Sequence, residues 1–185
     1  MSQVEMRGRV GMFCLICAEA AIFTIFVVAY VFYVGKSVAG PQAADVLQAP
    51  VFLTVCLLSS SVTVHAGVKA LTKGNVAGFA RWWLLTLALG AVFLVGTVFE
   101  WHRLIYVDGL TISTNLFGTT YFSLVGLHAF HVTAGLAALA LGSILALLGY
   151  VTPLHAPRSD VFSLYWHFVD VVWIVVFLVV YVAGR

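Results

Sequence analysis

The sequence predicts an all-α membrane protein, a bundle of five transmembrane helices. Of its 185 residues, 63% are hydrophobic and only 9% are charged, and the mean hydropathy is +1.09. A soluble domain carries roughly 25% charged residues, so this chain lacks the polar side chains needed to cover a water-facing surface. Its long apolar runs exceed the about 9–11 residues of a membrane strand and do not alternate with polar residues, which favours helices.

The expected spans use most of the chain. They are residues 10–34, 49–70, 82–105, 117–149 and 161–183. Each approaches or exceeds the about 20 apolar residues that a helix needs to cross a bilayer, and glycine, proline and charged residues fill the breaks. The first run is longer than the about 7–15 residues of a signal-peptide core, so we expect it to remain as a helix. Residues 1–185 are therefore predicted to form a single transmembrane domain with short loops.

The distribution of Lys and Arg predicts the orientation. Basic residues accumulate in cytoplasmic loops. With a cytoplasmic N-terminus, the inner ends of the spans hold six basic residues and the outer ends hold three. The inner set is Arg7, Arg9, Lys69, Lys73, Arg81 and Arg158, and the outer set is Lys36, Arg103 and Arg185. This predicts a cytoplasmic N-terminus and a periplasmic C-terminus, and the net charge of +2 gives no reason to expect a nucleic-acid partner.

Two glutamates lie in apolar surroundings. Glu19 falls near the middle of the first span with no Lys or Arg within a turn. Since a charge at this depth is costly, we expect Glu19 to be protonated or hydrogen-bonded to another helix. It could hold two helices together, or it could be a proton-linked or lipid-contacting group. Glu100 ends the third span beside Trp101, and Arg103 is close enough on the helix to form a salt bridge with it.

Histidines are the other candidate site residues. His128 and His131 are three residues apart on the fourth span and share a helix face. They could ligate a metal or a haem, but no further ligand set accompanies them, and we favour hydrogen bonds between helices. His65, among several serines and threonines on the second span, is expected to serve packing. The pair Cys14 and Cys17 lacks the following histidine of a c-type haem site and is read as apolar packing.

The fifth span begins with a dense aromatic and polar segment, YWHFVDVVW at residues 165–173. His167 and Asp170 are three residues apart and could pair with each other. Trp166, Asp170 and Trp173 lie on one stripe of the helix. An ion pair at a helix start, with aromatic rings at the membrane interface, accounts for this segment structurally.

These segments resemble the cytochrome c oxidase subunit III family. The segment at 165–173 is similar to the family signature YWHFVDxVW. Residues 118–122 and 126–132 resemble its G-S/T-T-F-F and G-x-H-G-x-H-V patterns, with Ala129 where the family often has Gly. Glu100 and Trp101 match the family's Glu-Trp or Glu-Tyr, although Thr97 replaces a frequent Gln. Glu19 matches the buried glutamate of the family, with Ala18 in place of Ser. The resemblance covers nearly the whole chain and fits the short bacterial form with five helices.

The resemblance implies a non-catalytic subunit of a haem-copper terminal oxidase. Such a subunit carries no haem or copper of its own; these belong to the partner catalytic subunit. It packs against oxidase subunits I and II, binds phospholipid and supports proton uptake, within the bacterial inner membrane and in some cases a larger respiratory supercomplex. In the family, the counterpart of Glu19 lines a lipid cleft. The counterparts of His128 and His131 face this cleft. Glu100, Trp166, His167 and Asp170 are further polar residues of the family motifs.

The sequence alone is compatible with other functions. Relatives of subunit III also accompany quinol oxidases and nitric-oxide reductases, and the electron donor binds elsewhere. A stand-alone transporter or proton channel is a second possibility, although we find no inverted repeat. A membrane enzyme with haem or metal at His128 and His131 is a third.

Overall fold

The computed structural model describes residues 3–184, which are helical over most of their length and include no strand. Five helical segments are long and apolar enough to cross a membrane. They are formed by α1 (Gln3–Tyr33), α3 (Val51–Thr72), α4 (Val76–Tyr106), α5 (Leu116–Leu147), and α6 (Ala156–Phe177) with its flanking turns. This confirms the predicted fold class, a multi-pass helical membrane protein. Arg185, counted above at the outer end, lies outside the described residues.

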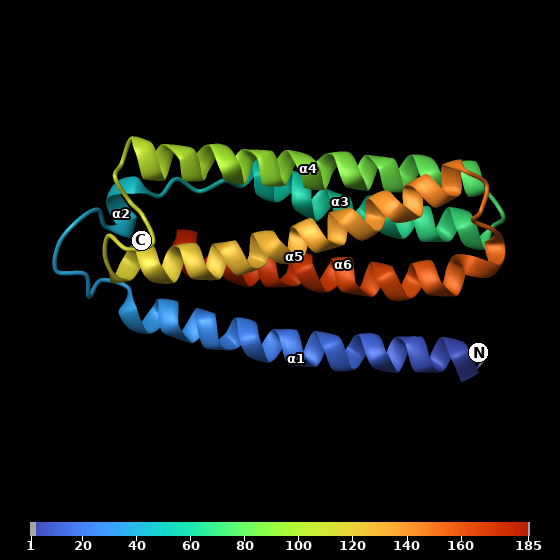
Figure 1. Cartoon of the computed structure of the whole chain (residues 1–185), viewed down its shortest axis with the longest axis horizontal. Helices are drawn as coiled ribbons and strands as arrows, with labels where there is room; N and C mark the ends of the chain where they lie inside the picture. Colours follow the sequence, from blue (N-terminus) through green and yellow to red (C-terminus); the bar gives the residue numbers. More distant parts are fainter. Residues whose placement is uncertain (1–2, 185) are drawn as a thin grey trace.

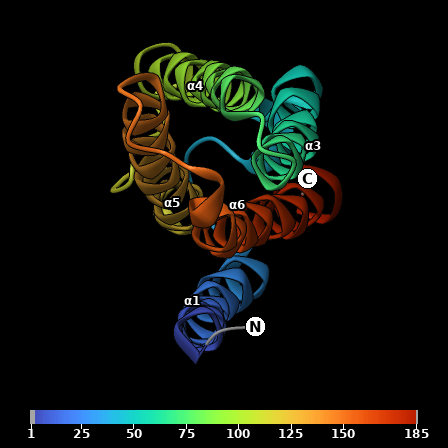
Figure 2. The same ribbon diagram turned by 90° about the vertical axis from the view of Figure 1, so that its right-hand side faces the viewer.

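Four of the helices form a ring, and the fifth lies outside it. Viewed end-on, α3, α4, α5 and α6 follow one another around the ring, while α1 rests against α5 and α6 (Figure 2). Figure 1 shows the long helices running side by side, with the short α2 (Ala43–Val46) in the first connection. Between residues 6 and 33 of α1, only Phe23 and Tyr30 are buried, so most of this helix faces outward.

Helix α6 is extended at both ends by other helical turns. A 3-10 turn, η1 (Pro153–His155), precedes it, and a π-helical turn, η2 (Leu178–Ala183), follows it. Pro157 lies at the start of α6, where a missing N–H costs no helical hydrogen bond. The wider π-helical turn is unusual, and such turns are frequent at functional sites. In this chain it carries the buried Tyr181.

Several helices begin earlier than the apolar runs predicted. Helix α4 begins at Val76 rather than at residue 82, because Asn75 caps it: the Asn75 side chain accepts a hydrogen bond of 2.7 Å from the Gly78 N–H. The last span begins at Pro153 rather than at residue 161. Helix capping satisfies backbone donors at a helix start without apolar side chains, so a search for hydrophobic runs misses these first turns.

Candidate functional site

Glu19 on α1 and His131 on α5 meet near the middle of their helices. Glu19 Oε2 lies 3.1 Å from His131 Nε2, and the two side chains are 23% and 7% exposed. The other ring nitrogen of His131, Nδ1, lies 2.8 Å from the Leu127 carbonyl oxygen, so it must carry a proton and donate. One proton is then shared between Glu19 and Nε2. Whether it is on the carboxyl or on the imidazole, the pair as a whole has no net charge, which suits its depth in the membrane.

His128 has a different environment from His131. Its ring is fully buried, and neither ring nitrogen has a hydrogen-bond partner among the described residues. It stacks on Trp173, with ring centroids 5.0 Å apart, and contacts the edge of Phe93 at 5.8 Å. The expected hydrogen bond between helices therefore forms at His131 and not at His128. Aromatic rings from α1, α4 and α6 pack around the His128 ring.

Two tryptophans of the 165–173 segment join α6 to α3. Trp166 Nε1 donates to Ser60 Oγ at 2.8 Å, and Trp173 Nε1 donates to Thr54 Oγ1 at 3.1 Å. The Trp166 indole also fits between two glycines of other helices. A Cβ added to Gly90 on α4 would lie 3.1 Å from this ring, and one added to Gly135 on α5 would lie 2.7 Å from it. The sequence predicted that these aromatic rings lie at the membrane interface. Both tryptophans are instead buried inside the ring of helices.

His167 and Asp170 are connected through a serine of α3. Ser61 Oγ lies 2.9 Å from His167 Nδ1 and also donates to Asp170 Oδ2. The serine has a single hydroxyl proton, so His167 Nδ1–H donates to Ser61 and Ser61 donates to the carboxylate. The expected direct pairing is thus replaced by a bridge. In a Ser-His-Asp hydrolase the histidine lies between the other two groups. Here the serine lies between them, an order that does not activate it as a nucleophile.

Glu100 is bound by two tyrosines. Tyr181 donates to Glu100 Oε1 at 3.0 Å, and the hydroxyl of Tyr121 lies 3.5 Å from the same atom and 3.2 Å from the Tyr181 hydroxyl. The expected salt bridge with Arg103 is absent from the described residues. Arg103 instead forms an ion pair with Asp108, at 3.6 Å, and donates to the Val46 carbonyl oxygen at 2.7 Å. The glutamate therefore joins α4 to α5 and to the π-helical turn.

Metal ligation was the alternative for the histidine pair. Within residues 3–184, no group of three or more His, Cys, Asp or Glu side chains is placed to hold a metal ion. His131 uses both ring nitrogens in hydrogen bonds, and Cys14 and Cys17 are free and exposed on α1. His65 is also exposed, on the outer face of α3, where packing between the helices of this chain does not reach it.

Comparison with known proteins assigns the family. The model of the family described as "Cytochrome c oxidase subunit III" matches residues 2–185. The chain belongs to the cytochrome c oxidase subunit III family. It is 43% identical over 129 residues to "Cytochrome c oxidase subunit 3" of Corynebacterium diphtheriae, covering 70% of this chain and 62% of the relative. It is 34% identical over 176 residues to the protein of the same name from Alkalihalophilus pseudofirmus, covering 94% and 85%.

A third relative has a similar sequence identity and coverage. "Probable cytochrome c oxidase subunit 3" of Nocardia farcinica is 38% identical over 135 residues, which cover 73% of this chain and 66% of the relative. The chain therefore spans slightly less than two thirds of the length of the Corynebacterium and Nocardia proteins. Family membership confirms the resemblance stated from the motifs.

The departures from the family motifs can now be placed in the structure. Thr97, in the position of a frequent Gln, donates to the Phe93 carbonyl oxygen of its own helix at 3.0 Å. Glu100 therefore receives its hydrogen bonds from Tyr121 and Tyr181 without a residue at position 97. Ala18, in the position of a frequent Ser, is exposed on α1, so no hydrogen bond within the described helices is lost there. Sequence reasoning missed Tyr181, because it lies eight residues beyond the signature.

Proposed function

We propose that this chain is the non-catalytic subunit III of a haem-copper terminal oxidase in aerobic respiration. The observation that carries the proposal is the use of the motif side chains. Glu19, Glu100, Trp166 and Asp170 each form hydrogen bonds with another helix of the chain. The motifs thus hold the bundle together, and redox chemistry is assigned to haem and copper in the partner catalytic subunit. The names of the relatives favour this function over a quinol oxidase, a nitric-oxide reductase or a stand-alone transporter.

The surface formed by α3 and α6 is the proposed contact with the other oxidase subunits. Ser61 and His167 lie near the middle of their helices and are only partly buried, and His65 is exposed one turn from Ser61. Polar groups at this depth are costly against lipid, whereas a transmembrane helix of another protein can hydrogen-bond with them. Subunits I and II of the oxidase are the proposed partners, within a larger supercomplex where one forms.

A groove between α1 and α6 is the proposed lipid site of the family type. It has a volume of about 340 Å³ and includes Ala20 and Phe23 of α1 and Val171 and Val175 of α6. Its lining is almost entirely apolar, as an acyl chain requires, and Glu19 precedes Ala20 on the same helix. We assign to Glu19 contact with this lipid and, through the proton that it shares with His131, support of proton uptake.

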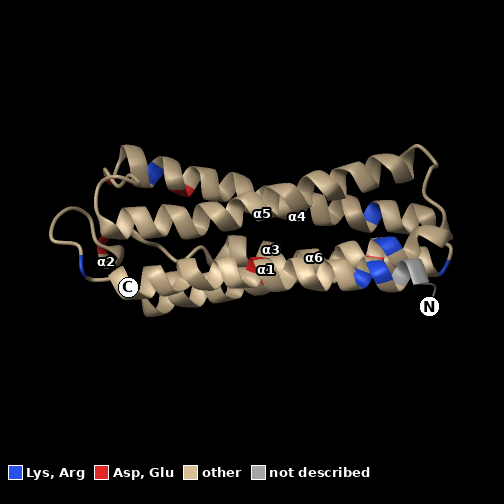
Figure 3. Cartoon of the chain, turned by 60° about the horizontal axis from the view of Figure 1, so that its bottom comes forward, with Lys and Arg blue, Asp and Glu red and all other residues tan. Residues whose placement is uncertain are grey.

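The charge distribution supports a cytoplasmic N-terminus. The helix order places Arg7, Arg9, Lys69, Lys73, Arg81 and Arg158 at the end of the bundle where α1 begins. Only Lys36 and Arg103 lie at the opposite end among the described residues. Figure 3 shows this concentration of basic residues beside the N-terminus. By the positive-inside rule this end faces the cytoplasm, and the bacterial relatives make the inner membrane the proposed location.

The proposal is tested by purifying the chain from its own membranes in mild detergent through a C-terminal tag. We expect the catalytic oxidase subunit and subunit II to co-purify in equal amounts, identified by mass spectrometry. A chain that is recovered without either, under conditions in which the oxidase itself remains intact, would contradict the proposal.

A further inference from the structure

A second groove lies at the end of the bundle where α1 begins, far from Glu19. Helix α5 runs beside α6 over much of its length but diverges toward α4 at this end, and the segment with Tyr150 and Val151 crosses back to α6 (Figure 1). The space between the two helices has a volume of about 360 Å³, and Phe79 and Trp83 of α4 form its floor. This volume lies within the about 300–1,000 Å³ of typical small-ligand sites.

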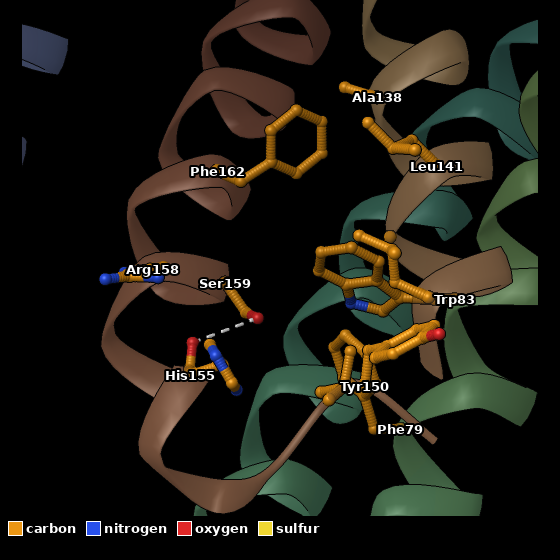
Figure 4. Close-up of a pocket in the computed structure, with 12 residues that line it drawn as sticks. Phe79, Trp83, Ala138, Leu141, Tyr150, His155, Arg158, Ser159 and Phe162 are labelled. Carbon is orange, nitrogen blue, oxygen red and sulfur yellow. Dashed lines mark hydrogen bonds between the residues drawn. The ribbon is translucent and has the colours of Figure 1, made fainter. Parts of the chain in front are cut away.

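The lining of this groove changes from apolar to polar along the membrane normal. Its inner part is formed by Ala138 and Leu141 of α5 and Phe162 of α6. Its outer part, at the end of the bundle, is formed by Phe79, Tyr150 and His155, and Arg158 lies at the rim with its side chain extending away from the groove (Figure 4). No Asp or Glu is among the lining residues. A ligand that fits therefore has a hydrocarbon part toward the membrane centre and a negatively charged part toward the aqueous phase.

The outer part of the groove offers hydrogen-bond donors that the protein does not use. His155 Nδ1 accepts the Thr152 N–H at 3.0 Å, so the neutral ring carries its proton on Nε2, which has no partner among the described residues. Arg158 is exposed and forms no ion pair in the described part of the chain. Its long side chain can turn toward the rim, as arginines near membrane interfaces do.

Trp83 lines the groove with its ring, while the pyrrole edge of its indole packs against Gly67 of α3. Trp83 is 3% exposed, and its indole N–H has no acceptor among residues 3–184. Figure 4 shows the indole nitrogen on the edge of the ring that is turned toward Ser159.

We propose that this groove binds one anionic phospholipid. Its phosphate lies at His155 and Arg158, and an acyl chain extends between Leu141 and Phe162. The site is separate from the groove between α1 and α6 and does not depend on the proposed oxidase function.

Native mass spectrometry of the full chain in detergent tests the site, by titration with phosphatidylglycerol, phosphatidylcholine or inorganic phosphate. We expect the phosphatidylglycerol to be retained most tightly. Arg158→Gln weakens its binding about fivefold, since one basic side chain near an anionic lipid is removed. Ala138→Phe, at an exposed position that lines the groove, blocks the acyl chain and reduces the number of retained lipids by one. Both variants retain the helical circular dichroism of the unchanged chain.

Matched controls use the same substitutions outside the groove. Arg81→Gln removes an exposed arginine at the same end, and Ala134→Phe enlarges an exposed alanine one turn earlier on α5. Both controls leave phosphatidylglycerol binding within twofold of the unchanged chain. Equal losses in controls and test variants, or equal retention of phosphatidylcholine, would show only a general lipid shell and overturn the proposal. Inorganic phosphate that competes fully with the lipid would reduce the site to an anion site and overturn it as well.

Discussion

At the scale of single residues, the polar side chains in the membrane form small hydrogen-bonded groups. Glu19 shares one proton with His131, and Asp170 accepts from Ser61 while Ser61 accepts from His167. The first group joins α1 to α5, and the second joins α3 to α6. Hydrogen bonds between membrane helices contribute about 0.6 kcal/mol on average and up to about 1.7 kcal/mol. Several such bonds, spread over the bundle, fix which helix faces meet.

The pair of Glu19 and His131 leads to a prediction about stability. Glu19→Leu leaves His131 Nε2 without a partner and lowers the free energy of unfolding by about 1 kcal/mol. Glu19→Gln keeps a donor for Nε2 and retains most of that stability. Unfolding of the purified chain in detergent, followed by near-ultraviolet circular dichroism, measures both. A Gln variant as unstable as the Leu variant would show that the hydrogen bond does not stabilise the fold.

The two histidines of α5 should respond differently to the same substitution. His128→Phe replaces a buried ring that has no hydrogen-bond partner with an apolar ring that stacks on Trp173 equally well, so the free energy of unfolding stays equal or rises by about 1 kcal/mol. His131→Phe removes two hydrogen bonds and lowers it. The same unfolding assay compares the variants. Equal losses would mean that His128 has a polar partner, such as a bound water.

The residue scale also shows what the sequence could predict. The depth of Glu19 and the lack of a nearby cation predicted that it is protonated or hydrogen-bonded to another helix, and the structure shows the hydrogen bond, to His131. A salt bridge between Glu100 and Arg103 was predicted because spacing in the sequence identifies only partners on the same helix. Its donors, Tyr121 and Tyr181, come from two other segments, and their approach depends on the packing of three helices.

At the scale of elements, α6 organises the ring. Trp166 and Trp173 bind hydroxyl groups of α3, and the Trp166 ring occupies the space left by Gly90 and Gly135. Small residues at helix contacts allow such close approach in membranes. The sequence placed serines and threonines together on the α3 span but did not show that tryptophans donate to them.

Two glycines of α5 allow a matched test of this packing. Gly135→Ala places a Cβ 2.7 Å from Trp166, and this overpacking lowers the free energy of unfolding by about 1–3 kcal/mol. At Gly126 the same change meets its nearest heavy atom, on Trp101, at 3.5 Å, an ordinary contact. Gly126→Ala therefore leaves stability unchanged or raises it by up to about 1 kcal/mol, since alanine favours a helix. The reverse order in thermal unfolding would contradict the assigned contact.

At the scale of the whole molecule, the five helices were predictable and their arrangement was not. Length and hydropathy identify each span because every membrane helix must cross the same thickness of the bilayer's hydrocarbon core. The position of α1 outside the ring depends on contacts of Phe23 and Tyr30 with other helices, which leave no periodic signal in a helix that is apolar all round. All five long helices expose large apolar side chains on their outward faces.

The surface of α3 and α6 leads to a prediction about assembly. His167→Ala or Asp170→Ala is expected to reduce retention of the chain in the purified oxidase at least threefold, while turnover per complex that retains it is unchanged. His102→Ala, at an exposed histidine on α4, serves as the control and does not alter retention. Full retention with lost turnover would assign these residues a catalytic role instead.

We propose that this chain is an oxidase subunit without a redox centre of its own. The most direct test is a visible absorption spectrum of the complex purified through this chain, recorded before and after the chain is stripped from its partners. We expect the haem and copper absorbance to co-purify with the chain and then to stay entirely with the partners. A stripped chain that keeps visible absorbance, or an initial complex that has none, would contradict it.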